Sequence, residues 1–160
     1  MPDYHYHTVD VFTEHRFGGN PLAVFPDAQG LDTATMQALA GELNYSETTF
    51  VLPPQDPANS AQVRIFTRTD EMPFAGHPNV GTAFVLAALG RVRGPMLRFE
   101  ELAGLVEVRL SEDGQGAEID APQPLSVKDT LPVAGIAACL SLDPRQIRTE
   151  AHLPLCASVG

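Results

Sequence analysis

The chain has 160 residues, carries a net charge of −10 and is 44% hydrophobic, a composition typical of a globular protein rather than a disordered one. Its length indicates one domain with a core of reasonable size. Because nucleic acids and anionic membranes both attract Lys and Arg, the acidic balance argues against either partner.

The amino-terminal sequence MPDYHYHTVDVF lacks a basic segment followed by an apolar one, so we expect no signal peptide. The longest uncharged run, residues 78–90, would span only about 20 Å as a helix, too short to cross a bilayer. Cys139 and Cys156 follow no metal-binding spacing, and we interpret them as reduced thiols of a cytoplasmic protein. Cys139 falls in an apolar stretch and is expected in the core.

The first part of the chain predicts two strands and one helix. Alternation favours a strand over 4–12, and a short strand is expected over 22–25. The loop Phe17–Pro21 joins them, with paired glycines that permit positive φ. Asp32 is a plausible N-cap of the following helix, and Asn44 is expected to end it. Apolar residues recur at helical spacing between these two ends: Met36, Leu39, Ala40 and Leu43.

Strands are then expected over 48–52 and 61–68, followed by a helix from about Pro78 to Leu89. Proline in its first turn and Gly90 after its end are typical helix boundaries. This helix is apolar on every side, which predicts that it is buried all round.

Three strands in a meander follow, and the tail contains a helix candidate over 131–142. The sequences of the three strands are MLRFEE, LVEVRLS and GAEIDA. Together the elements predict an α+β fold in which a mostly antiparallel sheet wraps around a central apolar helix. No repeated strand–helix–strand units and no phosphate-binding glycine loop are evident, so we reject a nucleotide-binding fold.

The stretch EMPFAGHPNVGTAFVLAALGR places one ionisable side chain, His77, at the start of the apolar helix. Free backbone N–H groups and the positive helix end favour an anion there, and a substrate carboxylate is a natural guest. The imidazole could hold that group or exchange a proton with it. The alternative is that His77 is a half-buried cap of the helix.

A second candidate is Glu47, in LNYSETTF, between a helix end and a strand. Ser46, Thr48 and Thr49 surround it with hydroxyl groups. Partial burial would raise its pKa towards that of a general base, whereas the alternative is an ordinary solvent-exposed glutamate.

A metal site is disfavoured. His5 and His7 alternate in the first strand, but no third or fourth ligand follows at a suitable spacing. We therefore expect no metal.

Three segments in order, VDVFTEHRFGGNPLAVF, LNYSETTFVLPP and VRIFTRTDEMPFAGHPNVGTA, closely resemble the phenazine-biosynthesis PhzF-like isomerase family over about residues 4–120. The resemblance implies the fold of diaminopimelate epimerase: two similar domains, each a curved antiparallel sheet around a central helix. It also implies that a small-molecule substrate lies in the cleft between them.

By this resemblance Glu47 is the acid/base residue, and His77, Gly76 and Asn20 are substrate-binding positions. We add Ser46, the neighbour of Glu47, to the binding set. The implied chemistry is cofactor-free isomerisation of a small cyclic or amino carboxylate such as trans-2,3-dihydro-3-hydroxyanthranilate. Related racemases use two cysteines, but the corresponding turn here, residues 75–77, contains no thiol.

Family members are roughly twice as long as this chain. We therefore expect residues 1–121 to form an N-terminal epimerase-like domain, and residues 122–160 to form a connector and the start of a second domain that is missing. Alone, the chain should have little or no isomerase activity and should expose an apolar face, which favours a homodimer or other self-association. The alternative is a non-catalytic half-domain that binds a small carboxylate or pairs with a partner.

Overall fold

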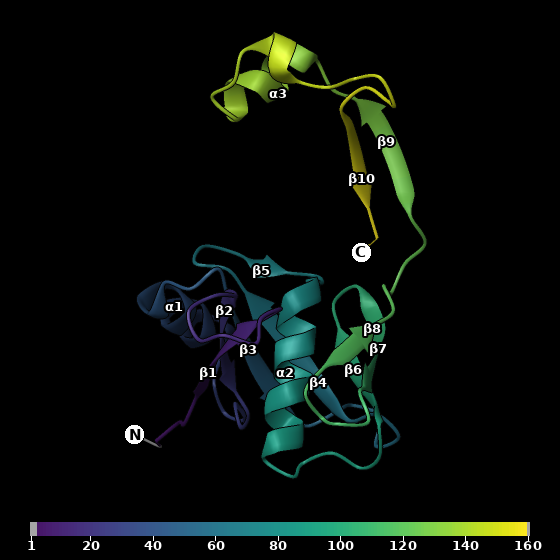
Figure 1. The fold of residues 1–160 in the computed structure, drawn as a ribbon. Helices are drawn as coiled ribbons and strands as arrows, with labels where there is room; N and C mark the ends of the chain where they lie inside the picture. Colours follow the sequence, from purple (N-terminus) through teal and green to yellow (C-terminus); the bar gives the residue numbers. More distant parts are fainter. Residues whose placement is uncertain (1–2, 160) are drawn as a thin grey trace. The chain divides into compact units, whose positions relative to one another are not determined.

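An eight-stranded sheet and two helices occupy the first part of the chain (Figure 1). The computed structural model describes residues 3–159, and the chain divides after Pro122 into two compact units. The strands of the first unit are β1 (His7–Val11), β2 (Asn20–Phe25), β3 (Glu47–Leu52), β4 (Ala61–Phe66), β5 (Glu71–Met72), β6 (Met96–Glu101), β7 (Gly104–Leu110) and β8 (Ala117–Ile119). Their order in the sheet is β1-β2-β3-β4-β6-β7-β8, and β5 pairs with β4.

The sheet is mostly antiparallel, as the sequence predicts, but two of its neighbouring pairs are parallel. β2 and β3 run parallel with Leu22 opposite Glu47, and α1 (Thr33–Leu43) connects them. β4 and β6 also run parallel, with α2 (Gly76–Ala88) in the connection. Parallel neighbours need such crossovers. The expectation that strand–helix–strand units are missing was therefore wrong.

Helix α1 begins and ends where the sequence predicts. The carboxylate of Asp32, the N-cap, accepts a hydrogen bond of 2.7 Å from the backbone N–H of Thr35. Asn44 ends the helix in the left-handed conformation, with φ of 58°. Met36 and Ala40 of the buried side pack on a small aromatic cluster of the sheet, made of Phe25, Phe50 and Phe66.

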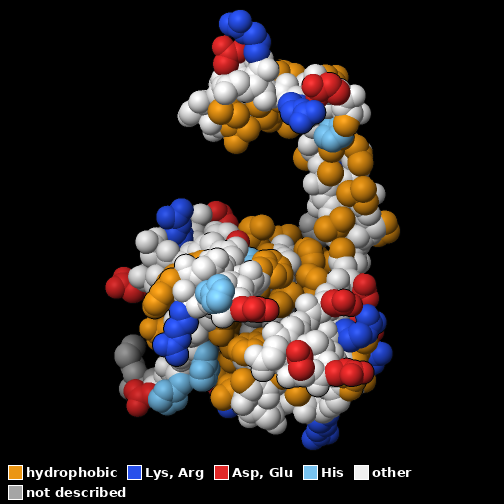
Figure 2. Space-filling model, viewed as in Figure 1, with side chains coloured by type: hydrophobic (Ala, Val, Ile, Leu, Met, Phe, Trp, Pro, Cys, Tyr) orange, Lys and Arg blue, Asp and Glu red, His pale blue; other side chains and the backbone are white. Residues whose placement is uncertain are grey.

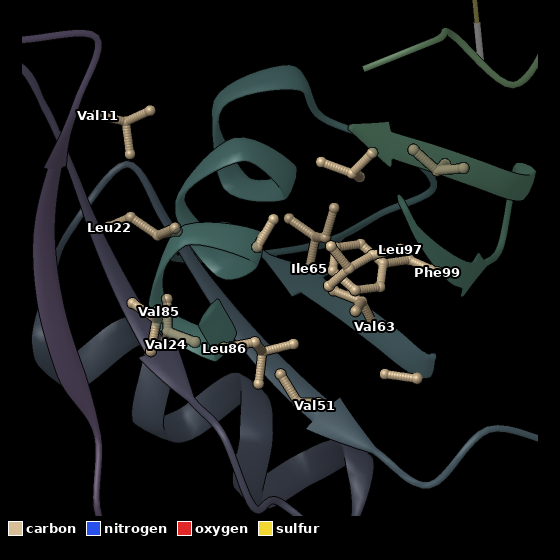
Figure 3. Packing of buried hydrophobic residues seen from close by; sticks show 14 residues of the cluster. Val11, Leu22, Val24, Val51, Val63, Ile65, Val85, Leu86, Leu97 and Phe99 are labelled. Carbon is tan, nitrogen blue, oxygen red and sulfur yellow. The ribbon is translucent and has the colours of Figure 1, made fainter. Parts of the chain in front are cut away.

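Helix α2 provides the centre of the main core, as Figure 3 shows. The members of this core are Val11, Leu22, Val24, Val51, Ala61, Val63, Ile65, Ala83, Val85, Leu86, Leu97, Phe99, Val106 and Val108. The helix is not buried all round, however, because Val80, Phe84 and Ala87 along one side stay partly exposed. Figure 2 shows hydrophobic side chains gathered where α2 lies in Figure 1.

Close packing, rather than backbone torsion, explains the glycines before β2. A Cβ atom on Gly19 would overlap the carbonyl oxygen of Val11, so no larger residue fits beside β1. The positive φ values of this loop belong to Phe12 and Phe17, both at 64°. The paired glycines permit positive φ, but the loop does not use that freedom, because its two positive values fall on phenylalanines. The same loop brings Asn20 to the start of β2.

The second unit contains β9 (Ser126–Thr130), α3 (Val133–Cys139), a short 3₁₀ helix η1 (Pro144–Gln146) and β10 (Leu155–Ser158). β9 and β10 form an antiparallel pair. Helix α3 is shorter than the predicted 131–142. Within the described part of this unit only Ala137 is buried, so it offers almost no core. Cys139 is consequently exposed, like Cys156, and its predicted core position was wrong.

Of the helices within residues 3–159, none combines the length and the apolar character that a membrane crossing requires.

Candidate active site

Glu47 is the first residue of β3, and it lies opposite Leu22 of the neighbouring strand β2. Its side chain is 19% exposed, so it is not the solvated loop glutamate of the alternative interpretation. Thr49 and Val51, two and four residues further along the strand, face α2. Because side chains alternate along a strand, Glu47 also points to the α2 side of the sheet.

His77 is the second residue of α2, and its side chain is only 9% exposed. The N-cap of the helix is Ala75, which makes no side-chain capping bond. His77 is therefore not the cap. Its ring contacts two other elements: Nδ1 lies 3.1 Å from Nδ2 of Asn20, and Nε2 lies 3.2 Å from Oε2 of Glu47.

A chain of polar contacts fixes the proton on the His77 ring. The hydroxyl of Ser46 donates to Oδ1 of Asn20 at 2.9 Å, which orients the Asn20 amide. The Asn20 NH₂ group can only donate, so Nδ1 of His77 accepts and Nε2 carries the proton of the neutral ring. That proton faces Glu47. The Nε2 and Oε2 atoms are within ion-pair distance, but they are not aligned as a hydrogen bond.

Burial favours the neutral imidazole. It lowers the pKa of His77 from the ordinary value of 6.5, and the nearby Glu47 carboxylate raises that pKa only in part. His77 is thus neutral near pH 7 and presents one N–H donor, beside a buried carboxylate, at the amino-terminal end of a helix. In this arrangement Glu47 can take a proton from a substrate carbon. The imidazole and the N–H groups of the helix can stabilise the oxyanion that develops.

The structure brings together Glu47, His77, Asn20 and Ser46, which the sequence nominated separately, and Gly76 precedes His77 in α2. A Cβ atom on Gly76 would make only ordinary contact with the side chain of Ile119, at 3.8 Å. Packing within this chain therefore does not demand glycine at that position.

One expectation about the surroundings of Glu47 needs correction. The hydroxyl groups of Thr48 and Thr49 do not contact it: Thr49 pairs with Thr82 at 2.8 Å, and the buried Thr48 hydroxyl has no partner. A substrate does not fit between Glu47 and His77 in this arrangement, because the two side chains lie 3.2 Å apart. It would have to approach beside the pair.

Sequence reasoning missed a second buried carboxyl group, Glu101, which lies against Asn79 of α2. Burial raises the pKa of Glu101 to about 8, and Asn79 opposes part of this increase. A signal was available, because Leu97, Phe99 and Glu101 alternate along the same strand and so share the face towards α2. A glutamate on a core-facing register is uncommon.

Within residues 3–159, no three His, Cys, Asp or Glu side chains gather in a group that could hold a metal ion. The side chain of His5, which precedes β1, and that of His7, the first residue of β1, are both exposed.

Comparison with known proteins places the chain in a family. A family model described as PhzC-PhzF, phenazine biosynthesis-like protein, matches residues 9–148. The chain belongs to this phenazine biosynthesis-like family. The match extends beyond residue 120, so it includes part of the second unit. It confirms the resemblance drawn from the three sequence segments.

Relatives in this family carry isomerase names. The chain is 48% identical over 166 residues to an uncharacterized isomerase of Mesorhizobium japonicum, covering 100% of this chain and 54% of that protein. It is 41% identical over 123 residues to the trans-2,3-dihydro-3-hydroxyanthranilate isomerase of Pseudomonas aeruginosa, covering 76% of this chain and 43% of that protein. The chain therefore spans about half the length of the curated relatives it matches.

A solved structure confirms the fold. A predicted epimerase from Pseudomonas aeruginosa superposes with a TM-score of 0.84 at 35% identity, covering 99% of this chain and 57% of that one. The α+β class, with its curved sheet around a helix, is thus shared with an epimerase-like protein.

Proposed function

We propose that this chain supplies one wall of a cofactor-independent isomerase, in which Glu47 transfers a proton between carbon atoms of a small cyclic or amino carboxylate. The single observation that carries the proposal is the contact between Glu47 and the neutral His77 at the amino-terminal end of α2. The isomerase names of the relatives support the reaction type. The relative from P. aeruginosa suggests trans-2,3-dihydro-3-hydroxyanthranilate as the first substrate to test.

In the proposed reaction the Glu47 carboxylate removes a proton from a substrate carbon, and the electron pair moves into the conjugated system of the substrate. The N–H groups at the start of α2 and Nε2–H of His77 face the negative charge that develops. Glu47, now protonated, returns the proton to another carbon, and no cofactor is consumed. A Cβ atom at Gly76 would clash with nothing in this chain, so a requirement for glycine there would come from a substrate that approaches the backbone.

We further propose that residues 122–160 form a connector and the start of a second domain, which would close the other side of the substrate. One wall cannot exclude water from the reacting carbon, so the chain by itself should turn over little or no substrate. Self-association of the isolated chain, as a homodimer or larger species, stays a prediction. A clean, fully active monomer in size-exclusion chromatography would contradict both the expected low turnover and the expected self-association.

The test is solvent-deuterium exchange into trans-2,3-dihydro-3-hydroxyanthranilate, followed by NMR in D₂O. Exchange of the carbon-bound hydrogen needs only the first proton transfer, for which this wall supplies both the base and the N–H donors, so it is measurable even where turnover is slow. Replacement Glu47→Gln should reduce exchange by at least about 100-fold, since a general base contributes that much or more. The matched control, Glu42→Gln, removes an exposed carboxylate from α1 and should leave exchange unchanged.

Two outcomes would overturn the proposal. Exchange that survives Glu47→Gln would show that Glu47 is not the base. Binding of the carboxylate without any exchange, for the chain and for any longer natural protein that contains it, would favour the non-catalytic carboxylate-binding half-domain.

A further inference from the structure

The segment that leads into α2 is joined to the sheet by a very short strand. β5, residues Glu71–Met72, lies off the main order of the sheet and pairs with β4. The chain then runs through residues 73–75 to Gly76, the first residue of α2 (Figure 1). Ala75, the N-cap of that helix, supplies no side-chain capping bond. The place of the first turn of α2 therefore depends on how this segment is anchored.

A pair of charged side chains supplies an anchor. The carboxylate of Glu71 accepts two hydrogen bonds from Arg64 of β4: Nε donates to Oε1 at 2.7 Å, and Nη2 donates to Oε2 at 2.6 Å. Both side chains are only 20% exposed, so water competes less for these bonds than it does at an exposed ion pair. The planar fork of the guanidinium fits the carboxylate in one orientation, which fixes both the distance and the angle at which β5 is held.

Arg64 is itself held by contacts with α1 and the core. Its Nη1 donates to the hydroxyl of Thr33, the first residue of α1, at 3.0 Å. Its guanidinium lies over the ring of Phe66, 5.1 Å from the ring centroid. Phe66 is buried in the aromatic cluster on which α1 packs. The anchor therefore joins β5 to the packed core rather than to a free surface side chain.

Two hydrogen bonds continue this anchoring towards the start of α2. The carbonyl of Pro73 accepts from the backbone N–H of Ala103 at 3.0 Å. The carbonyl of Ala75 accepts from Nδ2 of the buried Asn79, also at 3.0 Å. The segment is thus tied at its beginning, in its middle and at its end, and His77 lies in the turn that follows.

We propose that Arg64 and Glu71 are positioning residues for the proposed site: through β5 they hold the first turn of α2, which carries His77. The ring of His77 lies 3.2 Å from Glu47 and 3.1 Å from Asn20, and both partners belong to other strands. A displacement of the turn would therefore change both contacts and admit water to the ring. The inference rests on the proposed function only in treating His77 as a site residue.

The experiment is an NMR titration of the His77 ring in the unliganded chain, which involves no substrate. In Glu71→Gln the side chain keeps nearly its size but loses its charge and one acceptor. The ring signals should shift, and the pKa of His77 should rise towards the ordinary value of 6.5, because the displaced turn is less buried. Removal of a negative charge would by itself lower that pKa, so a rise reports the displacement. Arg64→Lys keeps the charge but not the fork, and should shift the same signals in the same direction.

A further variant tests the connection without breaking the ion pair. Thr33→Val removes the hydroxyl that accepts from Nη1 of Arg64, at an exposed position of α1 where the fold should tolerate the change. It should shift the His77 signals in the same direction as Glu71→Gln, but less. In the double variant it should add no further shift, because its effect passes through the same pair.

Glu107→Gln is the matched control. Glu107 of β7 accepts from Nε of Arg98 on β6 at 3.0 Å, so it too pairs with an arginine of a neighbouring strand. These two strands follow α2 in the chain instead of leading into it. The replacement should leave the His77 signals in place.

Two results would overturn the inference. One is a set of His77 signals that stays in place in Glu71→Gln and Arg64→Lys, whether or not urea unfolding shows a loss of stability, because the pair would then be structural only. The other is a fall in the pKa of His77 in Glu71→Gln, which would show the effect of charge without displacement. Since no reaction is measured, either result is separate from the outcome of the deuterium-exchange test.

Discussion

The buried Glu101 should make the stability of this chain fall with rising pH over an unusual range, and Glu101→Gln should remove that fall. In the folded protein burial raises the pKa of Glu101 from 4.5 to about 8. The folded state therefore binds the proton more tightly than the unfolded state does. The stability that depends on this proton is complete below pH 4.5 and is lost progressively as the pH rises to about 8.

The size of the effect follows from linkage. Each pH unit between the two pKa values costs about 1.4 kcal/mol, so the whole range corresponds to about 5 kcal/mol. Such a loss is comparable with the total stability of many domains, about 5–15 kcal/mol. A glutamine at position 101 cannot ionise, so its advantage over the wild type should grow with pH and level off above about pH 8.

The assay is urea unfolding followed by circular dichroism, for both proteins, at one-unit intervals between pH 5 and pH 9. Groups other than Glu101 titrate equally in both, so they cancel in the difference between the two free energies of unfolding. A difference that stays constant with pH would refute the reasoning. Glu100→Gln, at the neighbouring position of β6, is the control: hydrogen bonds from Asn59, Asp56 and Gln55 lower the pKa of Glu100, so its contribution is lost only on acidification and should not vary above pH 5.

Three further predictions concern the site and the core. Glu47→Gln removes the charge that partly raises the pKa of His77, so that pKa should fall further below 6.5 in an NMR titration; a rise would show that the Glu47 carboxylate does not raise it. Phe50→Ala empties a fully buried position whose ring stacks on that of Phe25 at 4.8 Å, and should lower the free energy of unfolding by about 3–5 kcal/mol, whereas a loss below about 1 kcal/mol would show that the aromatic cluster is not packed as described. Asp32→Ala removes the N-cap of α1 and should lower the midpoint of denaturant unfolding, and Asp32→Asn, which keeps an acceptor, should lower it clearly less.

Features set by neighbouring residues were predictable from the sequence. The limits of α1 follow from an aspartate that caps its start and an asparagine that adopts the left-handed conformation at its end. The strands β6 and β7 follow from alternation over six or seven residues. Glu47 and His77 stood out because a charged group at the boundary of an apolar element is unusual.

Alternation and composition were weaker guides where burial depends on distant segments. The helix α2 is apolar on every side, yet Val80 and Phe84 stay partly exposed because the sheet covers only part of its circumference. Cys139 lies in an apolar stretch but is exposed, since the second unit has almost no core to bury it.

The sequence by itself thus determined the class of the fold, the limits of its local elements and the two side chains on which the proposed chemistry depends. Only the tertiary structure decided that β2 and β3 run parallel, that Glu47 and His77 meet at 3.2 Å, and that Glu101 lies against Asn79. The physical reason is the separation along the chain over which each kind of interaction acts. Caps, turns and periodicity act over a few residues of chain, whereas strand order and side-chain contacts are fixed when segments twenty or more residues apart in the sequence pack on one core.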